Sequence, residues 1–195
     1  MREWVVGIDE VGRGPLAGPV TLCACAIEYK HYKKIKDQSL TDSKKMSPHA
    51  RMLWYKKALL LKKEGFLKFS LSYRSNRSID QRGIARVIQS ALFQTLRALA
   101  LNPKKTLVLL DGSLKAPEEY LFQRTIIKGD QKEKIISLAS VIAKVSRDKK
   151  MVALHKKYPD YDFVSNKGYG TRNHFKALKK KGLSPIHRKS FLSKL

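Results

Sequence analysis

The sequence contains few acidic residues and no long apolar segment. Only 16 Asp and Glu residues stand against 41 Lys and Arg in a chain of 195 residues, so the formal net charge is +25. No apolar run approaches the roughly 20 residues that a membrane span requires, and no cationic segment with an apolar core opens the chain as a secretion signal would. These absences predict a cytoplasmic protein with no membrane partner. The charge predicts a polyanionic partner: nucleic acid is the leading candidate, and an anionic membrane surface is the alternative.

Cysteine is nearly absent as well. Cys23 and Cys25 are the two cysteines, and their spacing places both side chains on one face of a strand. Residues so placed are poorly suited to a disulfide, and a CxC pair with no further cysteine is a weak metal signal. We therefore expect both to be small buried apolar residues.

The remaining composition is that of a folded protein. Hydrophobic residues make up 43% of the chain, enough for a globular core at this length. We expect a monomer with one domain over residues 1–195, in which 160–195 is a C-terminal helical extension. Apolar patterning and Gly/Pro punctuation predict strands near 3–10, 19–28, 66–73, 106–111 and 122–128. Helices are predicted near 48–63, 79–100, 132–157, 172–181 and 187–193, with a basic loop over 31–46. This order indicates an α/β fold with a mixed five-stranded sheet flanked by helices.

Acidic residues follow two of the predicted strands. One apolar run ends in Asp9 and Glu10, and another ends in Asp111. Carboxylates at the ends of buried strands are unfavourable unless a partner compensates them, and a divalent cation is a natural partner for carboxylate oxygens. Adjacent strand residues point to opposite faces, so Asp9 and Glu10 can share a site only where the strand ends or twists. Gly12 makes that possible, although the pair taken alone is equally compatible with a surface turn.

Several ordered blocks of the sequence form a recognisable set. The first is Gly7-Ile8-Asp9-Glu10-Val11-Gly12-Arg13-Gly14-Pro15-Leu16-Ala17-Gly18-Pro19-Val20. The others are Thr41-Asp42-Ser43-Lys44-Lys45, Asp111-Gly112, Lys128-Gly129-Asp130, the segment 137–148, Asn166-Lys167-Gly168-Tyr169-Gly170-Thr171 and Ile186-His187-Arg188. Over nearly the whole chain this pattern resembles bacterial ribonuclease HII, and the first block alone is already specific.

The resemblance implies a ribonuclease H-like fold and a metal-dependent endonuclease. It implies hydrolysis of RNA in RNA–DNA hybrids and incision 5′ of a single ribonucleotide in duplex DNA, leaving 3′-OH and 5′-phosphate ends. Asp9, Glu10, Asp111 and Asp130 match the family's catalytic and metal-binding carboxylates. The cofactor expected from the resemblance is Mn²⁺ or Mg²⁺. Two such cations can activate a water and stabilise the leaving oxygen of a phosphodiester, which requires several carboxylates in one place.

Substrate-binding residues also follow from the resemblance. Gly12-Arg13-Gly14 would bring the backbone close to the ribose 2′-OH, the group that distinguishes RNA from DNA, although glycines in a tight turn have a structural explanation as well. Arg13 would lie near a phosphate. Tyr169 matches a tyrosine that stacks on the deoxyribose following the ribonucleotide. Lys44 and Lys45 resemble phosphate-contacting lysines, whereas composition alone would leave them as solvated surface residues.

Three further residues have structural interpretations. Asp148 is expected in a salt bridge or on a helix surface, and His187 in a packing or phosphate-side role. Gly83 occupies a place where the family usually has Asn, and a glycine inside the predicted 79–100 helix costs up to about 1 kcal/mol.

Two rival functions remain at this stage. A non-enzymatic basic binder such as a ribosomal protein would explain the charge but not the carboxylates at two strand ends. Another nuclease of the same fold, such as ribonuclease HIII or a junction resolvase, would explain both. Ribonuclease HIII normally carries an extra N-terminal domain, whereas here the acidic block begins at Asp9. A metal-dependent nuclease assay separates the first rival from an enzyme.

Overall fold

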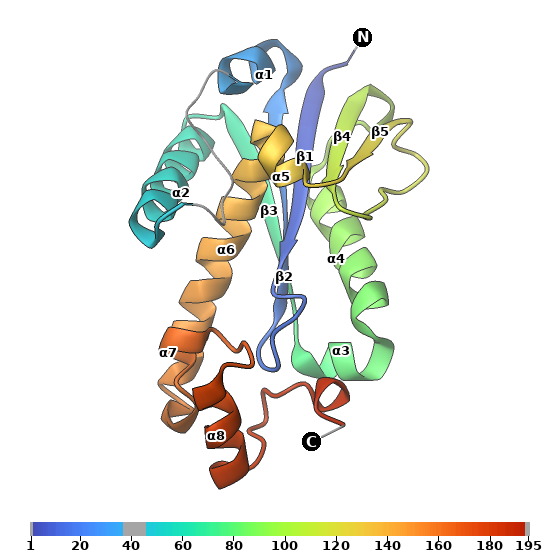
Figure 1. Ribbon diagram of the computed structural model, residues 1–195. Helices are drawn as coiled ribbons and strands as arrows, with labels where there is room; N and C mark the ends of the chain where they lie inside the picture. The colour runs from blue at the N-terminus through green and yellow to red at the C-terminus, as the bar shows by residue number, and fades with distance from the viewer. Residues whose placement is uncertain (1, 37–45, 194–195) are drawn as a thin grey trace.

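The computed structural model describes residues 2–36 and 46–193, so Lys44, Lys45 and the rest of the 41–45 block lie outside the described residues. The core of the fold is a five-stranded sheet in the order β3-β2-β1-β4-β5 (Figure 1). Its strands are β1 (Trp4–Val11), β2 (Val20–Glu28), β3 (Leu67–Arg74), β4 (Thr106–Asp111) and β5 (Phe122–Ile126). β1, β2 and β3 pair antiparallel, whereas β1–β4 and β4–β5 are parallel. The predicted mixed sheet is confirmed.

The strand register brings the acidic residues together. β1 and β2 are joined by the turn over residues 12–19, in which Gly12 and Gly18 have φ of 90° and 80°, a region that glycine adopts without steric cost. In the parallel pair of β1 and β4, Ile8 lies opposite Leu110. Asp9 and Asp111 are the next residues of their strands, so both lie at the same edge of the sheet.

Two long helices cover the two faces of the sheet (Figure 1). α4 (Ile84–Leu99) packs its apolar stripe against residues of β1 and β2 such as Ile8 and Leu22. α6 (Lys134–His155) packs on the opposite face, in one core cluster with Cys23 and Cys25. Both cysteines are free and buried, as predicted. The approach of α6 to β1 requires Gly7, because a Cβ atom there would lie 2.4 Å from the backbone of Ile135.

Four helical boundaries differ from the sequence prediction. The helix predicted over 79–100 is two helices, α3 (Asn76–Arg82) and α4, because Gly83 between them has φ 78° and ψ 149°. The helix predicted from 132 begins only at Lys134, after the short α5 (Gly129–Lys132), because Glu133 is extended. The predicted basic loop begins with a helix, α1 (Tyr29–Lys36), which buries Tyr32. The last predicted helix is a single 3₁₀ turn over Lys189–Phe191.

Two helices match their predicted ranges. α2 (Pro48–Lys63) begins at the expected Ser47 cap, whose hydroxyl accepts a hydrogen bond from the Ala50 N–H at 3.1 Å. α8 (Arg172–Lys181) is capped in the same way by Thr171. In both cases the cap side chain satisfies a backbone donor that the helix itself leaves unpaired.

The C-terminal region has a small core of its own. α7 (Phe163–Asn166) and α8 enclose a cluster that includes Phe163, Met151 and Leu178. Ala17, from the turn after β1, belongs to the same cluster. The C-terminal region therefore packs directly on the turn that follows the acidic pair. Within the described ranges, no helix combines the length and apolarity that crossing a membrane demands.

Candidate active site

A pocket of about 560 Å³ opens where β1 and β4 end. Its walls come from six parts of the chain: the ends of β1 and β4, the turn after β1, α2, α6 and the loop before α8. The lining residues are Asp9, Glu10, Val11, Gly12, Arg13, Gly14, Arg51, Asp111, Ser140, Lys144 and Tyr169. Three of the four predicted carboxylates and all the predicted substrate-binding residues that the structure describes thus line one cavity.

Asp9 is the most enclosed of the three carboxylates, with 5% of its surface exposed. One oxygen, Oδ1, accepts a hydrogen bond from the backbone N–H of Glu10 at 2.8 Å. Burial, together with the neighbouring Glu10 and Asp111 charges, raises the pKa of Asp9 to about 8 against the opposing hydrogen bond from Ser140. The surroundings of Asp9 therefore contain too little positive charge to stabilise its carboxylate form.

Glu10 lines the same pocket as Asp9, although the two are adjacent in a strand. This is possible because Glu10 lies one residue before the end of β1, where the chain enters the turn at Gly12. Glu10 Oε1 lies 3.5 Å from the Arg13 guanidinium. Burial raises the pKa of Glu10 to about 7; Arg13 opposes this shift and Asp111 adds to it.

Asp111 ends β4, and its side chain is oriented by the chain that follows β5. The backbone N–H of Gly129 donates to Asp111 Oδ1 at 2.6 Å. Asp130 is the residue after Gly129, which bonds to Asp111, but Asp130 is 3% exposed and does not line the pocket. The fourth carboxylate stays a prediction, placed beside the pocket and outside its lining.

The donor chemistry of the pocket fits a hard divalent cation. Three carboxylates face one cavity, and burial together with mutual repulsion raises the pKa of two of them. Bringing a cation to these oxygens would relieve both unfavourable effects. Among the described residues, no three acidic, histidine or cysteine side chains already converge as a ligand cluster.

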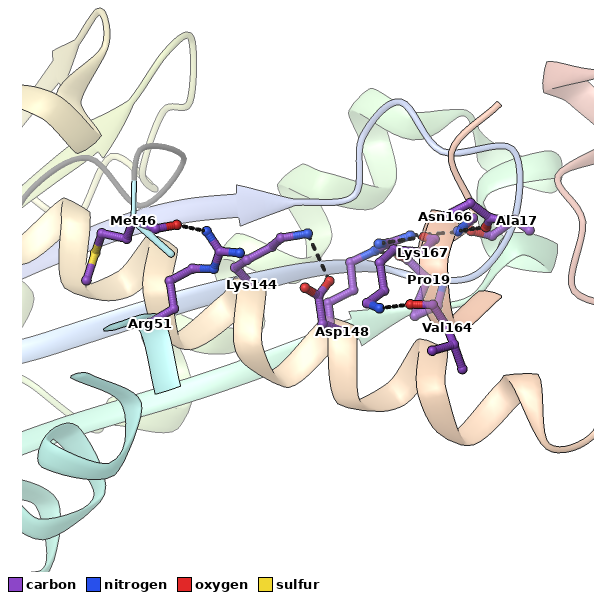
Figure 2. Close-up of polar contacts among 11 residues, drawn as sticks. Ala17, Pro19, Met46, Arg51, Lys144, Asp148, Val164, Asn166 and Lys167 are labelled. Atoms are coloured by element: carbon purple, nitrogen blue, oxygen red, sulfur yellow. Dashed lines mark hydrogen bonds and ion pairs between the residues drawn. The ribbon is translucent and has the colours of Figure 1, made fainter. Parts of the chain in front are cut away.

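Three pocket residues were not singled out from the sequence. Ser140 forms a hydrogen bond with Asp9, Lys144 pairs with Asp148 at 2.9 Å, and Arg51 Nη1 donates to the Met46 carbonyl at 2.5 Å (Figure 2). Ser140 and Lys144 are four residues apart on α6, inside a block already noted for its resemblance, so their helical spacing could have identified them. The Lys144 contact also confirms the salt bridge expected for Asp148.

The predicted substrate-binding residues occupy the rim of the pocket. Gly12 is buried, whereas Arg13 and Gly14 are exposed, with open space where a Gly14 Cβ would lie. Tyr169 is 42% exposed, and its ring centre lies 5.8 Å from the Arg147 guanidinium. His187 is not at the pocket: it is buried against His174, which agrees with a packing role.

The fold and the pocket together define a class. A mixed sheet with carboxylates at the ends of neighbouring parallel strands, in a strongly basic chain, is typical of a phosphodiester hydrolase with a ribonuclease H-like fold. The family model for Ribonuclease HII matches residues 6–194, and the chain belongs to that family. It is accordingly a metal-dependent endonuclease of the ribonuclease H type that acts on nucleic acid.

Individual relatives agree with this assignment. The chain is 41% identical over 193 residues to ribonuclease HII of Clostridium beijerinckii, and the matched residues cover 99% of this chain and 69% of that protein. Its structure is similar to the ribonuclease H2 of Pyrococcus horikoshii, with a TM-score of 0.72, 26% identity and coverage of 98% and 96% of the two chains. Bst-RNase HIII in complex with Mn²⁺ is similar in fold, with a TM-score of 0.68, 18% identity and coverage of 98% and 70%.

Proposed function

We propose that this enzyme hydrolyses the RNA strand of RNA–DNA hybrids and cuts duplex DNA on the 5′ side of a single embedded ribonucleotide. The products would carry 3′-OH and 5′-phosphate ends. The observation that carries the proposal is the position of Gly12-Arg13-Gly14 in the same pocket as Asp9, Glu10 and Asp111. A backbone able to approach a 2′-OH lies next to the carboxylates that would act on the adjacent phosphate.

Asp9, Glu10, Asp111 and Asp130 would hold Mn²⁺ or Mg²⁺, with Asp130 reaching the site from beside Asp111. When bound, the cations would lower the pKa of the attacking water and neutralise charge on the phosphate. Ser140 and Gly129 would orient Asp9 and Asp111 through the hydrogen bonds described above. Lys144 and Arg51 supply positive charge at the pocket wall for the substrate phosphates.

Recognition of the sugar would be divided between two parts of the rim. Backbone groups of Gly12-Arg13-Gly14 would hydrogen-bond the 2′-OH, with Arg13 near a phosphate, and Tyr169 would stack on the following deoxyribose. Lys44 and Lys45, outside the described residues, would contact phosphates. Residues 160–195 would act as a substrate-contacting extension of a monomeric enzyme. A site built to bond a hydroxyl discriminates strongly against its absence, because the polar groups of the site are then left unpaired.

The proposal is tested with four labelled duplexes of one sequence that contain no ribonucleotide, one, four or a complete RNA strand. Incubation with Mg²⁺ or Mn²⁺ should cut every duplex except the all-DNA one, and the single-ribonucleotide duplex should be cut on the 5′ side of the ribose. End-group analysis should find 3′-OH and 5′-phosphate. The matched control is Asp111→Asn. Equal cutting of all four duplexes, or cutting of the long hybrid alone, would refute the sugar recognition proposed here.

A further inference from the structure

Three segments distant in sequence are joined beneath the rim of the pocket. They are the turn 12–19, the loop 166–171 and the segment 184–188. The Gly18 N–H donates to the Ile186 carbonyl at 2.9 Å, and the backbone N–H of Arg188 donates to the Leu16 carbonyl at 2.8 Å. The Leu16 N–H in turn donates to the Gly168 carbonyl at 2.8 Å. The segment 184–188 therefore contacts the turn that carries Gly12-Arg13-Gly14, and the same turn contacts the loop that carries Tyr169.

Arg188 holds the turn through its side chain. It is fully buried, and its three guanidinium nitrogens donate to the carbonyls of Gly18 at 3.1 Å, Arg13 at 2.9 Å and Gly12 at 2.7 Å. A planar guanidinium can serve three carbonyls at once, whereas a lysine ammonium is a single point of charge on a flexible stem. Arg188 thus fixes the backbone of two of the three residues proposed to contact the ribose.

Arg147 of α6 makes a second set of such contacts. This side chain is also fully buried, and it donates to the carbonyls of Pro19 at 2.9 Å and Lys167 at 3.0 Å. The carbonyls lie at the right of Figure 2, where the turn after β1 meets the loop that precedes Tyr169. Both arginines therefore hold the turn by hydrogen bonds, and those to the Gly12 and Arg13 carbonyls come from Arg188.

A chain of hydrogen bonds leads from the same segment to Tyr169. The Ser184 N–H donates to His187 Nδ1 at 2.9 Å, so neutral His187 carries its proton on Nε2. That nitrogen lies 3.0 Å from His174 Nε2, which must accept, and His174 therefore carries its proton on Nδ1. His174 Nδ1 then donates to the Tyr169 carbonyl at 2.8 Å. Each assignment follows from the one before it, so both tautomers are determined.

The surroundings of the two histidines maintain their neutral state. Tyr161 and Phe163 contact both rings, the Tyr161 hydroxyl donates to the Gly182 carbonyl, and the Ser184 hydroxyl lies 2.8 Å from His187 Nδ1. Burial lowers the pKa of His174, and it lowers the pKa of His187 to about 4, with His174 contributing to that shift. A further proton on His174 Nε2 would face the N–H of His187, and a further proton on His187 Nδ1 would face the N–H of Ser184.

We propose that the adjacent residues His187 and Arg188 position the two sugar-recognition elements of the enzyme. Arg188 sets the backbone of Gly12-Arg13-Gly14, and His187, through His174, sets the loop of Tyr169. One dipeptide thereby fixes the spacing between the group that contacts the 2′-OH and the ring that contacts the following sugar. This inference rests on the proposed function. His187, His174 and Arg188 are positioning residues, because each acts through another residue and none lines the pocket.

The His174 branch is tested with two substitutions and a control. His174→Phe keeps a ring but cannot donate to the Tyr169 carbonyl, whereas the amide of His174→Asn can replace the Nδ1 donor. His174→Phe should reduce cutting at a single ribonucleotide, relative to a long hybrid, by about tenfold, the effect of one buried hydrogen bond. His174→Asn should restore most of this ratio. Leu178→Ala, which truncates a buried residue of the same core cluster, should lower stability and leave the ratio unchanged.

The Arg188 branch is tested by binding without divalent metal, so that no cleavage occurs. Arg188→Lys retains the charge and should reduce the preference for a duplex with one ribonucleotide over the same all-DNA duplex by about tenfold. Affinity for the all-DNA duplex should stay within about twofold, since the charge that contacts phosphates is unchanged. Arg97→Lys, at an exposed position on α4 that does not line the pocket, is the matched control and should leave both affinities unchanged.

A spectroscopic measurement completes the test. Imidazole ¹⁵N resonances at neutral pH should show both histidines neutral, His187 with its proton on Nε2 and His174 with its proton on Nδ1. Other tautomers, or substitutions that lower activity equally on every substrate, would overturn the inference and leave the proposed function standing. A wild-type enzyme that fails to prefer the ribonucleotide duplex would instead overturn the proposed function, and the inference with it.

Discussion

Asp9 lies near the end of β1 and Asp111 ends the neighbouring parallel strand β4, and the pairing of Ile8 with Leu110 places the two side by side at one edge of the sheet. The two carboxylates also share a pocket with Glu10, and the pKa of Asp9 is raised by burial and by both neighbours. This concentration of negative charge is unfavourable for the protein alone. Removing one of the charges should therefore damage catalysis without damaging the fold.

Asp111→Asn should abolish nearly all cleavage while the protein stays folded. The amide keeps the size of the side chain and its oxygen can still accept from the Gly129 N–H, but one anionic ligand is lost. The loss should exceed the about 10–100-fold typical of residues that only orient a metal ligand. Thermal unfolding and single-turnover cleavage measure the two properties. Asp148→Asn is the matched control, because Asp148 pairs with Lys144 on the helix surface. A folded Asp111→Asn enzyme with near wild-type turnover would contradict the metal site.

Binding to duplex should weaken steeply with salt. The formal net charge of +25 implies that several phosphates are neutralised on binding, and the release of counterions makes log K fall linearly with log salt, by about 0.9 per contacted phosphate on B-form DNA. Fluorescence anisotropy titrations on a non-cleavable all-DNA duplex give the slope. Lys144→Ala should reduce that slope by about one unit if this pocket lysine meets a phosphate. A response that is flat in salt would show that the basic residues face away from the substrate.

The sequence alone was sufficient for the sheet and for the acidic pair. The strands could be predicted because each is an apolar run that ends at Gly, Pro or an acidic residue. The parallel pairing of β1 with β4 is a property of the ribonuclease H-like fold that the resemblance implied. The break between α3 and α4 was missed because a periodic apolar stripe runs on from Ile84 and conceals the positive φ of Gly83. The start of α1 was missed because a lysine-rich composition hides Tyr32, a residue of that helix that packs on the core.

The support of the pocket rim could not be derived from sequence patterns. Arg188 and Arg147 are buried cations that donate to backbone carbonyls, whereas composition predicts a solvated arginine. The His174–His187 contact joins residues that have no ligand spacing and whose relation exists only once the C-terminal region folds back on the turn after β1. Asp130 shows the opposite limit: the motif identifies it, but its burial beside Asp111 is a property of the three-dimensional structure.

Gly12 and Gly14, two glycines of the turn after β1, should respond differently to alanine. A Cβ at Gly12 would lie 2.2 Å from the Arg147 side chain in a backbone with φ of 90°, whereas a Cβ at Gly14 meets open space. Gly12→Ala should therefore destabilise the fold by an amount typical of steric and backbone strain, about 1–3 kcal/mol or more. Gly14→Ala should leave the unfolding temperature unchanged and still reduce cutting at a single ribonucleotide, because the added methyl group would occupy the space of the ribose.

Denaturant unfolding and cleavage assays on the two variants separate these effects. Gly65→Ala is an informative comparison, since Gly65 also has positive φ but lies after α2, away from the pocket, with no atom near its Cβ position. It should show a modest loss of stability from strain and full substrate preference. Wild-type cutting by Gly14→Ala would indicate that the backbone at this position does not approach the sugar.

The contribution of the histidine pair to stability should depend on pH in a defined direction. Burial lowers the pKa of His187 to about 4 in the folded protein, whereas an unfolded histidine titrates near 6.5. The unfolded state therefore binds more protons below about pH 6.5, and the stability that the neutral pair provides is lost progressively as the pH falls from about 6.5 towards 4. Asp9 and Glu10, whose pKa values are raised, contribute with the opposite sign in the same range, so the comparison must be made between wild type and a variant.

Urea unfolding measures the free energy of unfolding of wild type and of His187→Gln. The difference between the two should be largest near neutral pH and smaller by up to about 3 kcal/mol near pH 4, because the variant has no proton to gain at that position. A difference that is constant across this range would show that His187 is not held neutral by the fold.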